Sequence, residues 1–236
     1  MVNKVPRETL QEKVYCSLKD SIIKNEMMPG DVLSIDSLSE ELGVSPTPVR
    51  EALARLSAQG LVINARNKKA RVAPISEADV REIYEVRKLL EPRATELAAV
   101  EIVDDQKLKG DLEKMKSRAK KIRESAKEGP LEPAQYDDYL KIDISLGETV
   151  EMALENSLLN NLLAQVNDHS LRIRSFTEAS SDEHAPEAVL ANTEEHLEII
   201  EKILSRNGDG VRNAVGQHLE NALNRTLKAL EENSRR

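Results

Sequence analysis

The chain has 236 residues, of which 39% are hydrophobic and 32% charged, a composition typical of a folded globular protein rather than a disordered one. No apolar run approaches the roughly 20 residues that span a bilayer, so we expect no membrane segment. The single cysteine, Cys16, excludes an intramolecular disulfide and fits a cytoplasmic protein, and the 2% aromatic content argues against stacking platforms for single-stranded nucleic acid.

Charge is unevenly distributed along the chain. The net charge is −8, yet residues 1–75 hold 11 Lys and Arg against 9 Asp and Glu. Within them, residues 44–73 hold six basic side chains against Glu51 alone. A small basic patch on an otherwise acidic protein predicts a localised contact with a polyanion.

The amino-terminal part reads as three helices separated by short extended segments. Apolar residues from Leu10 recur at helical spacing until the Pro29-Gly30 turn. Val32-Leu33 is long enough for only one edge strand. A second helix ends at Gly43, and a third begins at Ser45, which we expect to be its N-cap.

Two β-prone segments follow, over 61–63 and 71–74, and we expect them to pair around a basic tip at 64–70. A short helix, a glycine-containing turn and a second helix have the spacing of a helix-turn-helix, whose second helix enters the DNA major groove with its first residues facing the base edges. Arginine at that place can contact guanine with two hydrogen bonds. The expected DNA-binding residues are Ser45, Thr47, Arg50, Arg55, Arg66, Lys68, Lys69 and Arg71.

The alternative for this region is a structural helical hairpin with a basic loop. Glu51 and Arg55 stand four residues apart, so a surface ion pair between them is the alternative role of Arg55.

From Ser76 onward the sequence predicts helices almost throughout, with Ser76 and Asp79 placed to cap the first. Apolar residues recur every three or four positions in segments near 77–103, 105–127, 134–153, 157–179, 187–206 and 209–232. We therefore expect a mainly α protein. A winged helix-turn-helix domain would occupy residues 1–75, and an antiparallel bundle of six or seven helices would occupy residues 76–236.

One carboxylate and two imidazoles are placed to meet inside the bundle. His196 and His218 lie about 11 residues on either side of a tight connection, which puts them level on neighbouring antiparallel helices, and a third helix can bring Asp143 to the same layer. Such a set suits zinc, nickel, manganese or iron. The alternative is that both histidines are merely packed.

The helix-turn-helix segment carries a family resemblance in Pro29-Gly30, Leu38-Ser39-Glu40-Glu41-Leu42-Gly43-Val44-Ser45-Pro46-Thr47-Pro48-Val49-Arg50-Glu51-Ala52-Leu53, Leu56 and Gly60-Leu61-Val62. This set resembles the winged helix of bacterial GntR-family transcription regulators. The resemblance implies a homodimer that binds palindromic double-stranded operator DNA. Pro46 stands where the family often has a DNA-contacting arginine, and Lys69 where it usually has a wing glycine, so the operator sequence is expected to differ while the class remains.

The helical part carries a second resemblance in Tyr84-Glu85-Val86-Arg87-Lys88-Leu89-Leu90-Glu91-Pro92 and Glu96-Leu97-Ala98-Ala99. These match the opening helix of the FCD ligand-binding domain, and Asp143, Asn156, His196 and His218 also fall in the family pattern. The resemblance implies a divalent metal held by Asp-x3-His and two later histidines, beside a pocket for a small organic acid. Gly147 replaces the first histidine, so three ligands match and one is missing.

Arginines in such a pocket would bind the effector carboxylate through two parallel hydrogen bonds. The candidates for this contact are Arg87, Arg172 and Arg174. The favoured function is therefore a ligand-responsive transcription regulator. Two alternatives are a metal-dependent enzyme using Asp143, His196 and His218 with Glu148 as base, and a structural helical adaptor.

Overall fold

The computed structural model describes residues 9–63, 69–178 and 185–234. The chain divides into two compact units. One comprises Met1–Asp79 and Asn167–Phe176, and the other Val80–Val166 and Thr177–Arg236. The sequence placed the division between residues 75 and 76. The segment at 167–176 groups with the first unit because Asp168 forms an ion pair with Lys19 at 2.5 Å and His169 Nε2 lies 2.8 Å from the carbonyl oxygen of Gln59.

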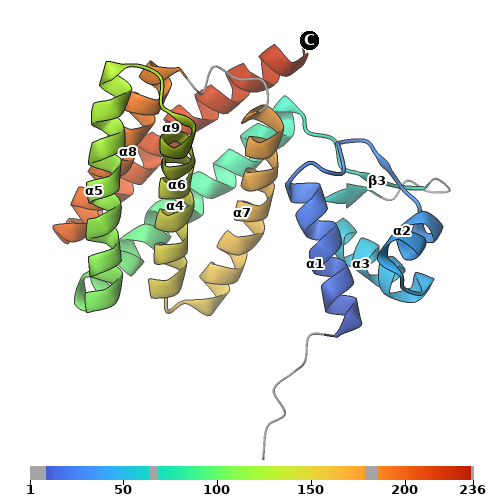
Figure 1. The fold of residues 1–236 in the computed structure, drawn as a ribbon. Coiled ribbons are helices and arrows are strands. Elements are labelled where there is room, and N and C mark those ends of the chain that lie inside the picture. The colour runs from blue at the N-terminus through green and yellow to red at the C-terminus, as the bar shows by residue number, and fades with distance from the viewer. Residues whose placement is uncertain (1–8, 64–68, 179–184, 235–236) are drawn as a thin grey trace, which may run out of the picture. The chain divides into compact units, whose positions relative to one another are not determined.

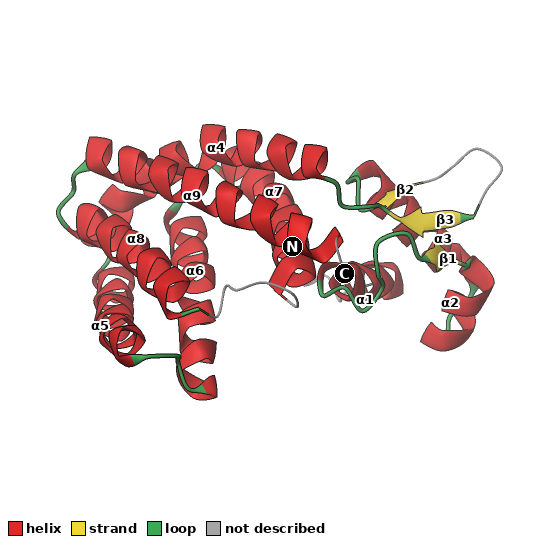
Figure 2. Ribbon diagram, turned by 90° about the horizontal axis from the view of Figure 1, so that it is seen from above, coloured by secondary structure: helices red, strands yellow, loops and turns green. Residues whose placement is uncertain are grey.

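The first unit is a three-helix domain with a small sheet. Its elements are α1 (Leu10–Ile23), β1 (Val32–Leu33), α2 (Ile35–Leu42), α3 (Pro46–Ala58), β2 (Val62–Ile63) and β3 (Ala70–Val72). β3 lies between β1 and β2 and pairs antiparallel with both, as Figure 2 shows. The expected pairing of β2 with β3 is confirmed, with Val62 opposite Val72. The sequence pattern did not predict that β1 pairs with β3.

The core of this unit fixes the direction of α3. Leu18 and Ile22 of α1 pack in one buried cluster with Leu56 of α3 and Val72 of β3. Gly43, with φ of 65°, ends α2 in the left-handed conformation that glycine adopts without strain, and the chain turns there into α3. One side of α3 is therefore held against the core and the other faces solvent.

The second unit contains six helices in the described part of the chain (Figure 1). They are α4 (Glu77–Asp104), α5 (Gln106–Glu128), α6 (Pro133–Ala153), α7 (Ser157–Glu178), α8 (Pro186–Leu204) and α9 (Gly208–Ser234). Residues 77–79 of α4 and 167–176 of α7 belong to the first unit. The expected helical bundle is confirmed. Ser76 and Asp79 bond reciprocally at the start of α4, and Asn156 Oδ1 accepts from the Leu159 amide at the start of α7.

Packing in this unit brings together α6, α8 and α9, the helices that carry Asp143, His196 and His218. α5 packs against α6 and α8, and α8 packs against α9. Ile142 on α6, Ile200 on α8 and Leu219 on α9 are all at most 1% exposed, so each helix is anchored close to the position that carries a cluster residue. Among the described residues, no helix has a stretch long and apolar enough to cross a membrane.

Candidate functional site

The start of α3 presents polar side chains to solvent. Ser45 is the N-cap residue, as expected, but its side chain makes no capping hydrogen bond, and Ser45, Thr47 and Arg50 are all exposed. No hydrogen bond or ion pair joins Arg50 to another residue in the ranges that the structure describes. Pro46 and Pro48 carry no amide hydrogen, so two backbone donors are missing from this first turn. The polar contacts available here come mainly from side chains.

A hollow of about 460 Å³ lies beside this helix start. Its lining includes the first residues of α2, Arg50 and Leu53 of α3, Lys69 just before β3, and Ala70 of β3. Arg50 and Lys69 place two positive charges on the hollow and Asp36 places one negative charge there. Two of the expected contacts, Arg66 and Lys68, lie outside the described residues.

Arg55 and Arg71 already have partners within the protein. Arg55 bonds Glu12 through both terminal nitrogens, at 2.7 and 3.3 Å, and lies 3.6 Å from the centre of the Tyr15 ring. The sequence spacing allows an ion pair of Arg55 with Glu51 as the alternative, but the partner of Arg55 in the structure is Glu12 on α1. Arg71 donates to the carbonyl oxygen of Gly30 at 2.8 Å. Both side chains remain exposed.

Arg172 and Arg174 belong to the first unit, whereas the histidines belong to the second. Arg172 is only 3% exposed, and its guanidinium donates to the carbonyl oxygen of Ala73. Burial lowers the pKa of Arg172 to about 10. These two expected effector ligands thus belong to a different unit from the candidate metal site.

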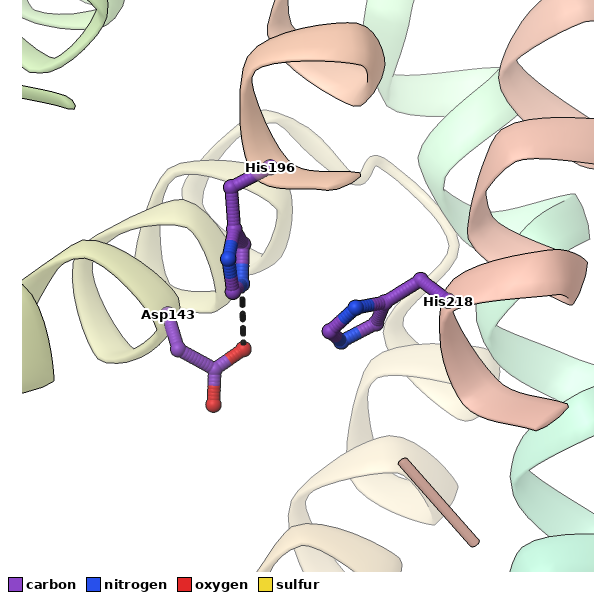
Figure 3. Close-up of side chains that lie close together, drawn as sticks. All are labelled: Asp143, His196 and His218. Carbon is purple, nitrogen blue, oxygen red and sulfur yellow. Dashed lines mark hydrogen bonds and ion pairs between the residues drawn. The ribbon is translucent and has the colours of Figure 1, made fainter. Parts of the chain in front are cut away.

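Asp143, His196 and His218 do come together, as the sequence predicted. One ligand atom from each lies within 4.8 Å of the other two. His196 Nε2 is 3.1 Å from Asp143 Oδ1, and the two imidazole ring centres are 4.7 Å apart. Figure 3 shows His218 turned toward the Asp143–His196 pair from a separate helix. Both histidines are buried, while Asp143 is partly exposed.

The hydrogen-bond partners on the far side of each ring determine which nitrogen carries the proton. His196 Nδ1 lies 2.8 Å from the carbonyl oxygen of Asn192, and His218 Nδ1 lies 2.8 Å from Glu195 Oε2. Both partners only accept hydrogen bonds, so both Nδ1 atoms donate. In the neutral imidazoles the two Nε2 atoms then carry lone pairs. Together with the Asp143 carboxylate they form a set of acceptors that fits a cation.

The electrostatics around His218 also favour a neutral ligand. Burial lowers the pKa of His218; the hydrogen bond to Glu195 opposes this, and the electrostatic interaction with His196 lowers the pKa of His218 further. Burial alone would raise the pKa of Glu195, but hydrogen bonds from His218 and Arg225 lower it to about 2. Glu195 is therefore a carboxylate, and His218 is held as the uncharged imidazole that metal ions bind.

The fourth position of the family pattern is open. Gly147 lies one helical turn beyond Asp143 on α6, and a Cβ added at Gly147 would meet no described atom within 4 Å outside its own stretch of helix. A Cβ therefore has room at this position. The donor set that the described residues supply is thus three groups, which leaves coordination positions for water or a ligand.

Arg87 is the one expected effector ligand in the same unit as this cluster. It is 9% exposed, and its Nε and Nη2 atoms donate to Glu91 at 2.6 and 3.3 Å. Burial alone would lower the pKa of Arg87, but the charges of Glu91 and Asp143 raise it. The guanidinium is therefore a buried permanent cation close enough to Asp143 to interact with its charge.

The sequence reasoning missed the polar residues behind the histidines, namely Asn192, Glu195, Asn221 and Arg225. A weak signal existed, because Asn192 stands four residues before His196 and Arg225 stands seven after His218, each on the same helix face.

Two family models match the chain. The model described as bacterial regulatory proteins of the gntR family matches residues 10–72, and the FCD domain model matches residues 82–221. The HTH-type transcriptional regulator LutR of Bacillus subtilis is 30% identical over 231 residues, covering 90% of this chain and 99% of LutR. The HTH-type transcriptional repressor RspR of Escherichia coli is 28% identical over 235 residues, covering 97% of this chain and 94% of RspR.

A solved structure has the same fold. The chain of E. coli McbR/YncC superimposes with a TM-score of 0.71 at 19% identity, covering 93% of this chain and 98% of that chain.

Proposed function

Because the chain belongs to the GntR family of bacterial transcription regulators and carries an FCD domain, we propose that it binds a palindromic operator as a homodimer and that a small carboxylate modulates this binding. The related families and proteins are regulators, so the chain is a transcription regulator and not an enzyme. Its place of action would be the cytoplasm, where operator DNA lies.

The observation that carries this proposal is the exposed guanidinium of Arg50 at the start of α3, which has no partner among the described residues and lies beside Lys69 on a common hollow. In a helix-turn-helix protein this part of the second helix meets the base edges. Arg50 would bond guanine, while Ser45 and Thr47 would bond base edges or phosphate. Lys69 and Arg71, with Arg66 and Lys68, would neutralise phosphates next to the groove. Arg55 would act indirectly, by holding α3 against α1 through Glu12.

A stripe of apolar side chains on α4 supports the proposed homodimer. Val86, Leu89, Leu97 and Val100 lie on one narrow face of the helix and are 41%, 71%, 38% and 48% exposed. Burying such a stripe against its copy would stabilise a two-fold dimer, and a two-fold dimer matches the symmetry of a palindromic operator.

The residues of the helical unit fit a divalent metal, which Asp143, His196 and His218 would hold. When bound, the ion would supply a positive centre that coordinates an oxygen of the effector. Arg87 would bind the same carboxylate from the protein side, sharing the guanidinium with Glu91. The pocket would accept a larger effector than in relatives that have histidine at the position of Gly147.

Regulation would follow from a difference in effector affinity between two arrangements of the dimer. A ligand shifts DNA binding only if it binds the two arrangements unequally, and the DNA then changes the ligand affinity by the same factor.

Selection of duplexes from a random DNA library by the full-length protein tests the DNA-binding proposal, run in parallel with Arg50→Ala. We expect the selected sequences to contain an inverted repeat whose half-sites are separated by about one helical turn or a multiple of it. Binding should weaken steeply with salt and survive chelation of metal. Lack of enrichment by the wild-type protein, or enrichment of the same repeat by Arg50→Ala, would refute the role given to α3.

A further inference from the structure

A group of partly buried polar side chains stands behind His218, on the side away from Asp143. Glu195 of α8 is its centre, with a side chain that is 15% exposed. Asn221 and Arg225 of α9 complete the group, one and two helical turns beyond His218. A carboxylate held inside a helical unit is costly unless it is fully hydrogen-bonded, so its partners indicate what it does there.

Both oxygens of Glu195 accept two hydrogen bonds. Oε1 accepts from Asn221 Nδ2 at 2.8 Å and from Arg225 Nη1 at 3.0 Å. Oε2 accepts from Arg225 Nη2 at 3.0 Å and from His218 Nδ1 at 2.8 Å. Four donors therefore fix the plane of the carboxylate. The guanidinium of Arg225 also compensates the negative charge of Glu195. The group is therefore stable while His218 is the neutral imidazole, with a single proton on Nδ1.

Arg225 connects this group to the other histidine. Its Nη2 atom also donates to Asn192 Oδ1 at 3.0 Å, and Asn192 donates to the Tyr139 hydroxyl at 2.8 Å. The backbone carbonyl of the same Asn192 is the acceptor for His196 Nδ1. One arginine thus holds both residues that accept hydrogen bonds from the two imidazoles.

We infer that Glu195 is a positioning residue that holds His218 in the tautomer with the proton on Nδ1, so that the Nε2 lone pair faces Asp143 and His196. This inference rests on the proposed metal site, which needs that lone pair. Hydrogen-bonding partners of this kind orient histidine ligands, and their loss typically weakens metal affinity about 10- to 100-fold.

Replacing Glu195 with glutamine gives the sharpest test, because glutamine has the same shape and one acceptor oxygen instead of two. In Glu195→Gln the carbonyl oxygen is expected to stay with the Asn221 Nδ2 atom and the Arg225 guanidinium, which can only donate; Asn221 Oδ1 is occupied as the acceptor for Gln217. The amide NH2 would then point at His218 Nδ1 and make it an acceptor. The ring would move its proton to Nε2, the atom that faces the metal site.

Two measurements on the full-length protein separate this role from a structural one. Nitrogen-15 NMR of the metal-free protein at about pH 8, above the usual histidine pKa, reports the tautomer of His218. Titration with Zn²⁺ alone reports the affinity. We expect Nδ1–H in the wild type and Nε2–H in Glu195→Gln, with Zn²⁺ affinity about 10- to 100-fold lower in the variant. Glu194→Gln, at the exposed neighbouring position, should match the wild type in both.

The other outcomes are equally decisive. An Nε2–H tautomer in the wild type overturns the inference without any variant, as does a Glu195→Gln protein that keeps Nδ1–H or binds Zn²⁺ with unchanged affinity. If the wild type binds no Zn²⁺, the proposed metal site fails. The tautomer measurement then still decides whether Glu195 sets the state of His218.

Discussion

His196 Nε2 lies 3.1 Å from Asp143 Oδ1, although the two residues are 53 positions apart in the sequence. The carbonyl of Asn192 already accepts a hydrogen bond from His196 Nδ1, so in the neutral ring the contact with Asp143 joins the Nε2 lone pair to a carboxylate. Two such acceptors attract each other only when a proton or a metal ion lies between them. A cation would therefore stabilise the contact between α6 and α8 at this point.

Gly147→His is expected to strengthen Zn²⁺ binding at this site. Histidine there would stand one helical turn from Asp143 and supply the fourth ligand of a tetrahedral zinc site. We expect an increase in affinity of about tenfold or more, equivalent to about 1.4 kcal/mol, measured by calorimetric titration.

Gly147→Ala is the matched control. Its methyl group has room, so it should leave Zn²⁺ affinity unchanged and stabilise the mid-helix position by about 0.5–1 kcal/mol. Equal affinity of the histidine variant and the alanine control would show that position 147 does not face the metal.

Arg50→Ala is expected to reduce discrimination between operator and random duplex by about 1–3 kcal/mol, because a bidentate contact to guanine would be lost. Fluorescence anisotropy with labelled duplexes measures both affinities. Arg118→Ala, an exposed arginine on α5, removes the same charge from the other unit and should bind operator like the wild type. An equal loss in both variants would mean that Arg50 acts only through net charge.

The stability of the metal-free protein is expected to fall as the pH drops below the ordinary histidine pKa. The pKa of His218 is about 6.5 in the unfolded chain and lower in the folded one, so the unfolded state binds the proton first. The stabilising contribution of a neutral His218 is complete above about pH 6.5 and is lost progressively toward the folded pKa. Urea unfolding at several pH values, with metal chelated, should show a smaller decrease for His218→Asn. An identical pH dependence of both proteins would contradict this origin.

Leu89→Glu is expected to dissociate the proposed dimer. Leu89 is 71% exposed in the single chain, and burial of a leucine side chain contributes about 1.5–3 kcal/mol, which two copies would lose together. Analytical ultracentrifugation should show a dissociation constant raised by more than about tenfold. Met152→Glu, at a 67% exposed position on α6, should leave the association unchanged. A monomeric wild type, or a dimer that tolerates Leu89→Glu, would place the interface elsewhere.

The helices were predictable because each buries one face in a regular pattern. The segments expected near 134–153 and 157–179 agree with α6 and α7 to within one residue at each end. The sheet was less predictable, since a two-residue strand such as β1 has no periodicity of its own. Its pairing with β3 depends on the return of the chain after α3.

The three ligands of the candidate site followed from spacing and family resemblance, whereas their hydrogen-bond partners did not. Glu195 carries no signal that separates it from the exposed Glu194 beside it. Its role depends on the contacts of α8 with α9, which decide which of two neighbouring carboxylates faces His218. The partner of Arg55 was likewise not predictable from local spacing, because Arg55 pairs with Glu12 on α1 instead of with Glu51 on the same helix.

The prolines at positions 46 and 48 affect how the operator preference of such a protein can change in evolution. Backbone amides attract phosphate whatever the neighbouring side chains are, so a helix start rich in them adheres to any duplex. With two of these donors absent, operator recognition as proposed would rest on a few side chains that single codon changes can exchange. New target promoters would then be acquired by point mutation at Ser45, Thr47 and Arg50, without rebuilding the domain.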